Sequence, residues 1–178
     1  MTGGGPGGRP GTLRSPRAAR RRVGIALVAV VVACVDLAAK AWATGALGDR
    51  VVGLGPLELR LGYNTGVAFS LAAGAPSWLV VAVTAAITAG VAVVAWLAGA
   101  RGTPVQRGAL GLLLGGAVAN LVDRAGDGRV TDYLHTGWWP TFNLADVAIV
   151  TGTVLLVLAS LRRQPDDQVD EPTSASGG

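Results

Sequence analysis

The sequence predicts an all-α membrane protein with four transmembrane helices and a small extracytoplasmic β-rich element between helices 1 and 2. The first reason is composition: 51% of the 178 residues are hydrophobic and only 15% are charged, whereas soluble domains carry about 25% charged residues. The second is the presence of four apolar segments near the length of about 20 residues that crosses a bilayer. The third is the position of the arginines. They lie outside these segments, and most of them fall on the connections and tails of one predicted side of the membrane.

The first predicted helix follows a tail rich in Gly, Pro and Arg. Residues 1–22 show no apolar periodicity, so we expect a disordered cytoplasmic tail. The apolar segment 23–43 has 21 residues and contains Asp36 and Lys40. A secretory signal peptide has a shorter apolar core, of about 7–15 residues, without such charges. We therefore expect a retained helix, with Asp36 and Lys40 on one face as a structural ion pair that holds the bundle together.

Three further apolar segments complete the predicted membrane domain. Segment 78–98 contains no charged residue. Segment 108–122 is short, so its ends must lie near the interfaces or the bilayer must thin around it. Segment 144–161 begins after Asn143, a residue type favoured at helix N-caps. The remaining residues, 162–178, are acidic and rich in Ser and Gly, and we expect a second disordered cytoplasmic tail.

The basic residues predict how the chain is oriented. Ten of them lie in the two tails and in the connection between the second and third segments, and four lie in the other two connections. Because the richer side faces the cytoplasm, both termini are expected there, and connections 44–77 and 123–142 are expected outside. The alternation of Leu with charged residues over 57–61 predicts a short hairpin or small sheet on the membrane surface.

Composition also argues against several kinds of site. The net charge of +4 comes without interleaved aromatic and basic residues, so no nucleic-acid partner is expected. Cys34 is the only cysteine and is interpreted as a small apolar packing residue. His, Cys and carboxylate residues show no ligand-like spacing, so neither a metal nor another cofactor is expected.

Three aspartates, Asp123, Asp132 and Asp146, cluster around the second outer connection. Two carboxylates held close together cannot both ionise easily, so one stays protonated beside an ionised partner. Such a pair can activate a water and polarise a carbonyl. Spacing alone does not choose which two form the pair, and helix capping remains an alternative role for Asp146. Asn120 and Asn143, each three residues before an aspartate, can donate hydrogen bonds or join helices.

Five motifs together resemble those of the lipoprotein signal peptidases (signal peptidase II). They are Asp36 with Lys40, and residues 64–70, 115–124, 130–133 and 142–146. Their order and spacing agree with that family over residues 23–161. The resemblance implies an aspartic endopeptidase of the bacterial cytoplasmic (inner) membrane, with its active site at the extracytoplasmic face. It further implies cleavage of diacylglyceryl-modified prolipoproteins just before the lipidated cysteine. We expect the protein to be a monomer among membrane lipids.

The resemblance also assigns roles to individual residues. It makes Asp132 and Asp146 the catalytic pair. The residues that would shape the site or hold the substrate are Asn64, Gly66, Asn120, Asp123, Arg124, Asn143 and Ala145. Arg124 is expected to bind a backbone carbonyl or to pair with Asp123. Thr131 and Tyr133 depart mildly from the family pattern, and the following loop is expected to place His135 at the surface and Trp138 and Trp139 at the membrane interface.

The residues alone leave three alternatives open: a serine peptidase mechanism, a transporter and a scaffold subunit. A Ser70–Lys40 pair would make a serine peptidase, although no nucleophile-elbow pattern surrounds Ser70. A small proton-coupled transporter would use Asp36, Lys40 and the outer aspartates as a relay, although the chain has no internal repeat. A scaffold subunit would not need the aspartate cluster.

Overall fold

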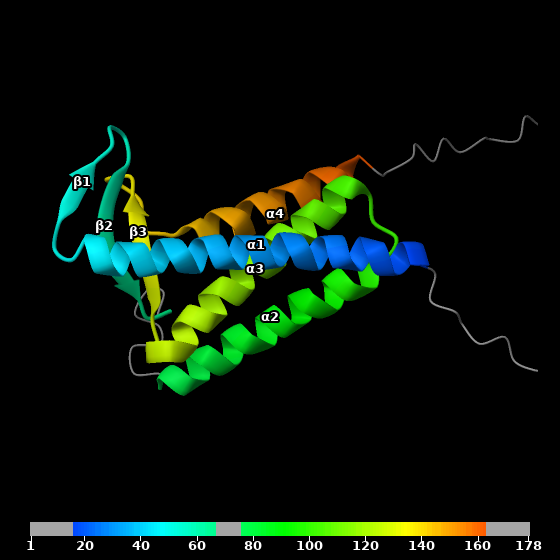
Figure 1. Ribbon diagram of the computed structural model, residues 1–178, viewed down its shortest axis with the longest axis horizontal. Coiled ribbons are helices and arrows are strands. Elements are labelled where there is room, and N and C mark those ends of the chain that lie inside the picture. Colours follow the sequence, from blue (N-terminus) through cyan, green and yellow to red (C-terminus); the bar gives the residue numbers. More distant parts are fainter. Residues whose placement is uncertain (1–15, 67–75, 163–178) are drawn as a thin grey trace, which may run out of the picture.

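A computed structural model describes residues 16–66 and 76–162 as a helix bundle with a small sheet at one end (Figure 1). The helices are α1 (Pro16–Ala46), α2 (Ser77–Gly99), α3 (Pro104–Asp127) and α4 (Leu144–Leu161), and the strands are β1 (Val51–Gly53), β2 (Glu58–Asn64) and β3 (Val130–His135). All four helices are long and apolar enough to cross a membrane. The predicted fold class is therefore confirmed. We call the end that carries the strands the sheet end and the opposite end the arginine end.

Helix α1 begins at Pro16, before the predicted start at residue 23. Proline is tolerated in the first turn because that turn needs no N–H donor. The arginines that follow contact the other helices: Arg21 Nη1 donates to the Ala100 carbonyl at 2.8 Å, and the Arg22 guanidinium lies 4.2 Å from the Trp96 ring centroid. The predicted disordered tail 1–22 is thus corrected for residues 16–22, while 1–15 and 163–178 lie outside the described residues.

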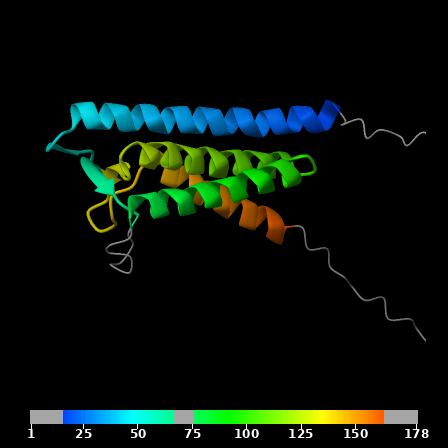
Figure 2. The same cartoon turned by 90° about the horizontal axis from the view of Figure 1, so that it is seen from below.

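Helix α3 is longer than predicted and lies at the centre of the bundle. It has 24 residues, not the 15 of segment 108–122, so the bilayer need not thin around it. A capping box formed by Thr103 and Gln106 starts the helix, and Gly128, at a φ of 80°, ends it. Figure 2 shows α1 on one side of α3, with α2 and α4 toward the other side.

Two adjacent glycines let α3 approach two helices at once. A Cβ atom on Gly115 would lie 2.6 Å from the Ala29 carbonyl oxygen of α1, and one on Gly116 would lie 2.5 Å from the Ala145 carbonyl oxygen of α4. Helices in lipid associate through such close backbone contact. This packing brings the polar residues of α1, α3 and α4 to the same level.

The sheet has the order β1-β2-β3, with both pairs antiparallel. The predicted β element after α1 is present, and its third strand comes from the α3–α4 connection, which the sequence did not predict to be β-structure. Tyr63 pairs with Thr131 and Gly62 with Asp132. Tyr133 packs with Ala43 and Leu47 in a small buried cluster, so the sheet is fastened to the end of α1.

Candidate active site

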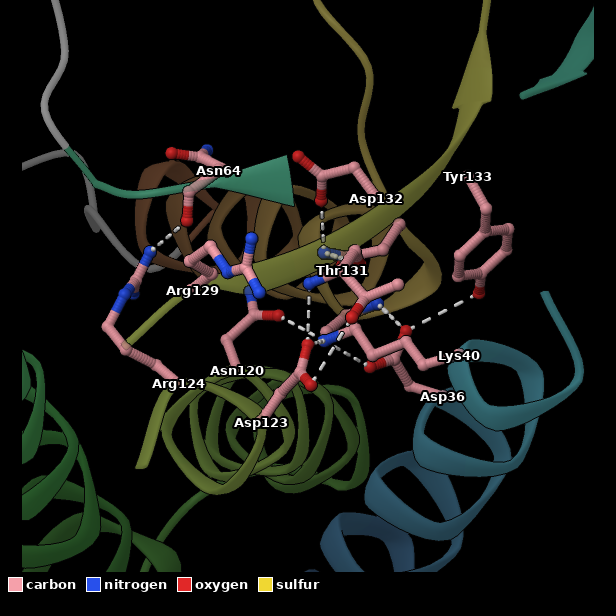
Figure 3. A network of polar contacts seen from close by, with 12 residues as sticks. Asp36, Lys40, Asn64, Asn120, Asp123, Arg124, Arg129, Thr131, Asp132 and Tyr133 are labelled. Atoms are coloured by element: carbon pink, nitrogen blue, oxygen red, sulfur yellow. Dashed lines mark hydrogen bonds and ion pairs between the residues drawn. The ribbon is translucent and has the colours of Figure 1, made fainter. Parts of the chain in front are cut away.

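The predicted site residues lie together at the sheet end, although they come from five elements. Helix α1 carries Asp36 and Lys40, α3 carries three residues, and the rest lie at the end of β2, on β3 and at the start of α4. Figure 3 shows most of them as one polar network between α1, α3 and β3. The residues of the 64–70 motif after Gly66, including Ser70, lie outside the described residues.

Asn143 contacts both aspartates of the predicted pair. Its side-chain Nδ2 donates to Asp132 Oδ1 at 2.7 Å, and its backbone N–H donates to Asp146 Oδ2 at 3.3 Å. The Asn143 Oδ1 atom accepts from the Asp146 N–H at 2.9 Å, which completes a capping box at the start of α4. The capping role for Asp146 is therefore present, but it uses one carboxylate oxygen and leaves the other free for a second partner.

Asp132 is buried and electrostatically perturbed. Its side chain lies on β3 and is 2% exposed. Burial and then the negative charge of Asp146 raise the pKa of Asp132 to about 7, and the hydrogen bond from Asn143 opposes this rise. A carboxyl group with such a pKa holds a proton about half of the time at neutral pH. Asp132 can therefore supply a proton near neutral pH, beside the carboxyl group of Asp146.

Asn120 connects Asp146 to the first helix. Its Nδ2 atom donates to Asp146 Oδ1 at 2.8 Å, while its Oδ1 atom accepts from Lys40 Nζ at 2.7 Å. Lys40 Nζ also lies 2.9 Å from Asp36 Oδ2 and 3.3 Å from Asp123 Oδ2. The predicted Asp36–Lys40 ion pair is present, and Lys40 additionally reaches two residues of α3.

Asp36 fastens α1 to the start of α4. Its Oδ1 atom accepts from the Ala145 backbone N–H at 2.9 Å and from the Tyr133 hydroxyl at 3.5 Å. Tyr133 in turn accepts from the Leu144 N–H at 3.3 Å. Burial raises the pKa of the Tyr133 phenol, so that it stays protonated and can donate. The sequence showed Tyr133 only as a departure from a family pattern, and its contacts with α1 and α4 were missed.

Asp123 and Arg124 do not pair with each other in the described part of the chain. Asp123 Oδ2 accepts from the Thr131 backbone N–H at 2.7 Å, which holds β3 against the end of α3. Arg124 Nη2 donates to the Asn64 carbonyl and Nη1 to the Thr84 hydroxyl, each at 3.4 Å. Of the two expectations for Arg124, the contact with a backbone carbonyl is therefore present, and pairing with Asp123 is wrong because Lys40 and Thr131 occupy that carboxylate.

Gly66 lies beside the contact between Arg124 and the Asn64 carbonyl. It has a φ of 77°, a conformation that favours glycine, and its N–H donates to Asn64 Oδ1 at 2.7 Å. A Cβ atom there would lie 2.8 Å from the Val80 side chain and 3.2 Å from Arg124 Nη2. Glycine thus leaves room for the guanidinium beside the end of β2.

An apolar cavity of about 380 Å³ opens beside Asp146. Its walls include Trp138, Trp139, Phe142 and Val150. The two tryptophans are exposed and meet edge to face, with ring centroids 5.5 Å apart. His135 is half-buried on β3, beside this loop, rather than fully at the surface. One carboxylate of the pair therefore lines a space suited to an apolar ligand, and the described residues contain no His, Cys, Asp or Glu cluster arranged for a metal ion.

Known proteins share both the sequence pattern and the fold. Residues 28–162 match the family model for signal peptidase (SPase) II. The chain is 36% identical to the lipoprotein signal peptidase of Mycolicibacterium smegmatis, over 94% of this chain and 77% of that protein. It is 38% identical to the lipoprotein signal peptidase of Rhodococcus jostii, over 80% and 74% of the two chains. A solved bacterial membrane enzyme, determined by the in meso method, is similar with a TM-score of 0.68 and 25% identity, covering 82% of this chain and 92% of that chain.

These similarities extend across the whole membrane domain. The matched residues include α2, α3, α4 and the sheet, together with most of α1. They therefore include every residue of the polar network at the sheet end. The family, the four apolar helices and the bacterial relatives indicate a multi-pass bacterial membrane peptidase. The chain belongs to the signal peptidase II family.

Proposed function

We propose that this peptidase is an aspartic endopeptidase that removes the signal peptide from diacylglyceryl-modified prolipoproteins, cutting before the lipidated cysteine. The observation that carries the proposal is the double contact of Asn143, whose amide and backbone N–H groups bind Asp132 and Asp146 respectively. A single buried residue thereby holds two carboxylates beside each other. This arrangement suits the activation of water without a covalent intermediate.

The two aspartates differ in their surroundings, and the difference assigns their roles. Asp146 accepts from Asn120 Nδ2 and from the Asn143 N–H, so both oxygens act as acceptors. Asp132, with a pKa of about 7, is the partner that holds the proton. Asp146 takes a proton from a water as that water attacks the scissile carbonyl, and Asp132 donates its proton to the carbonyl oxygen. Asp146 then donates its proton to the departing nitrogen as the C–N bond breaks, and Asp132 takes a proton from a hydroxyl of the tetrahedral intermediate, which returns both carboxyl groups to their starting states.

Lys40 acts on this pair through Asn120. An ammonium group can only donate, and a carboxylate can only accept. Lys40 Nζ at 2.7 Å from Asn120 Oδ1 therefore forces the amide to present Nδ2 to Asp146. Lys40 is thus a positioning residue as well as the partner of Asp36.

The substrate reaches the pair through the apolar cavity beside Asp146. A signal peptide and a diacylglyceryl group are both apolar and lie in the bilayer, so an opening between tryptophans and aliphatic side chains of α4 suits them. Among the described residues, seven arginines lie at the opposite end of the bundle and four at the sheet end, and this excess supports an outward-facing site and cytoplasmic termini.

The test is cleavage by purified protein in detergent micelles. We expect a shorter product from a diacylated prolipoprotein, no product from the same precursor without its lipid, and full activity with a serine acylator or a chelator present. Cys34→Ala controls for reaction of the acylator with a thiol, because Cys34 is the only cysteine in the sequence and is exposed on α1. Inhibition by the acylator would favour Ser70 and Lys40, and equal cleavage of the unlipidated precursor would contradict the proposed specificity.

A further inference from the structure

A second cavity, of about 390 Å³, lies between α1 and α3 at the arginine end. Three guanidinium groups line it, from Arg20, Arg21 and Arg107, together with Gly24 and Gly108. We call it the arginine groove. Every acidic residue in the described part of the chain belongs to the other half of the molecule, beginning with Asp36 on α1. Asp36 lies 16 residues beyond Arg20, or about 24 Å along the helix. The groove is therefore basic, with no carboxylate near it among the described residues.

Two of the three guanidiniums are held in place. Arg21 Nη1 donates to the Ala100 carbonyl at 2.8 Å, and Arg107 Nη1 donates to the Gly102 carbonyl at 2.7 Å. Each bond uses one of the five N–H donors of a guanidinium. Arg22, by contrast, turns to the Trp96 side of α1 and does not line this groove. The fixed donors that remain can receive an anion at little entropic cost.

The two glycines keep the groove open. A Cβ atom on Gly24 or on Gly108 would meet nothing within 4 Å, whereas one on Gly111, a turn further along α3, would lie 2.7 Å from the Val28 side chain. The helices thus touch at Gly111 and separate toward the arginine end. An elongated apolar group can lie in this opening, with its charged end among the arginines.

We propose that the arginine groove binds an anionic membrane phospholipid, with the phosphate among Arg20, Arg21 and Arg107 and the first acyl carbons beside Gly24 and Gly108. The groove lies at the end of four helices that are long and apolar enough to cross a membrane. In a bilayer, the ends of such helices lie near the lipid headgroups. Basic pockets between transmembrane helices are suited to such headgroups. The site is remote from the aspartates, so this inference is independent of the proposed proteolytic function.

The test measures lipid binding to the full chain in neutral detergent by native mass spectrometry. We expect phosphatidylglycerol to bind more tightly than phosphatidylcholine. The double variant Arg20→Gln/Arg107→Gln should weaken phosphatidylglycerol binding about 25-fold, since each basic residue contributes about fivefold. Arg162→Gln is the matched control, because Arg162 is exposed at the same end but does not line the groove. A folded double variant that binds phosphatidylglycerol as the wild type does would overturn the proposal.

A second set of variants separates a lipid from a free phosphate. Gly24→Leu and Gly108→Leu should fill the apolar part of the groove and weaken phosphatidylglycerol binding. Gly90→Leu should have no effect, because Gly90 is also open on a helix surface but lies on α2. Soluble glycerol phosphate should bind far more weakly than the lipid. Equal binding of glycerol phosphate, or unchanged lipid binding in both groove variants, would contradict the lipid assignment.

The acidic C-terminal tail is the competing occupant. Its four acids are Asp166, Asp167, Asp170 and Glu171. Changing them together to their amides in the full chain should leave phosphatidylglycerol binding within about twofold, because the proposal assigns the groove to lipid. If lipid binds only after this change, the groove serves the chain's own tail and the proposal is wrong.

Discussion

The two ends of the bundle differ in how their charged side chains are placed: several are buried and paired at the sheet end, whereas most are exposed at the arginine end. At the sheet end, Asp36 and Lys40 are 1% and 3% exposed, and each makes several polar contacts. At the arginine end, Arg20 and Arg21 are exposed and no acidic residue of the described chain lies nearby. Buried charges must be paired to be tolerated, whereas exposed charges at a helix end are solvated. Folding stability should therefore depend on each polar partner at the sheet end. It should depend much less on any single arginine at the arginine end.

The largest effect of a substitution at the sheet end is expected at the proposed catalytic pair. Asp132→Asn and Asp146→Asn should each lower cleavage by at least 10²–10⁴-fold, because an amide neither takes a proton from water nor supplies one. Single-turnover cleavage, normalised to folded protein from thermal melts, measures the effect. Asp123→Asn should lose stability and keep residual turnover, since Asp123 contacts Thr131 and Lys40 rather than Asp146. A folded, inactive Asp123→Asn with an active Asp132→Asn would reverse the assignment.

The next largest effect is expected at Lys40. Lys40→Met leaves two carboxylates, Asp36 and Asp123, without their cation, and breaking such buried pairs costs about 3–5 kcal/mol. It also frees the Asn120 amide to rotate, so kcat should fall even in the folded fraction. Thermal melts and single-turnover rates separate the two effects. Arg129→Met is the control, because its pair with Asp127 is exposed and should cost at most about 1 kcal/mol. A destabilised Lys40→Met with normal kcat would leave Lys40 a purely structural role.

The raised pKa of Asp132 predicts a pH dependence of stability. The folded protein binds this proton with a pKa of about 7, against the usual 3.8. The contribution of Asp132 to stability is therefore present below pH about 4 and is lost as the pH rises to about 7. Melting temperatures from pH 4 to pH 8 should show this loss in the wild type and not in Asp132→Asn. Cleavage should also decline above pH about 7, where the proton leaves. Parallel stability curves for the two proteins would contradict the perturbed pKa.

A smaller effect is expected where α3 meets α4. Gly116→Ala places a methyl group 2.5 Å from the Ala145 carbonyl oxygen, a backbone atom that cannot give way alone. Such overpacking typically costs about 1–3 kcal/mol, and it should move Asn120 away from Asp146. Gly90→Ala meets open space and should be neutral or stabilising by up to about 1 kcal/mol. Equal melting temperatures for the two variants would show that the helices separate easily at this level.

The smallest effect belongs to the arginine end. Deleting residues 1–15 and 165–178 should leave cleavage within about twofold, because these segments lie beyond the ends of α1 and α4, remote from the aspartates along the chain. A membrane-inserted but inactive truncation would show that the two ends are coupled.

Much of this protein follows from its sequence alone. The four helices were predicted because a long apolar segment is sufficient by itself to form a membrane helix, whose backbone bonds are all internal. The Asn143–Asp146 cap was also predicted, since its residues lie three positions apart. The early start of α1 was not predictable locally, because its arginines contact another helix. The early start of α3 was predictable, because the Thr103–Gln106 capping box is a local pattern, and this signal was missed.

Tertiary structure decided the rest, because the remaining contacts join distant parts of the chain. Lys40 and Asn120 are 80 residues apart, and Asp36 and Ala145 are 109 apart. The spacing of Asp123, Asp132 and Asp146 did not select a pair. The glycines of α3 bring α1 and α4 close enough for Lys40 to contact Asp123 and for Asn120 to reach Asp146, and these contacts support the pair that we propose. The third strand and the contacts of Tyr133 likewise depend on partners that no local pattern specifies.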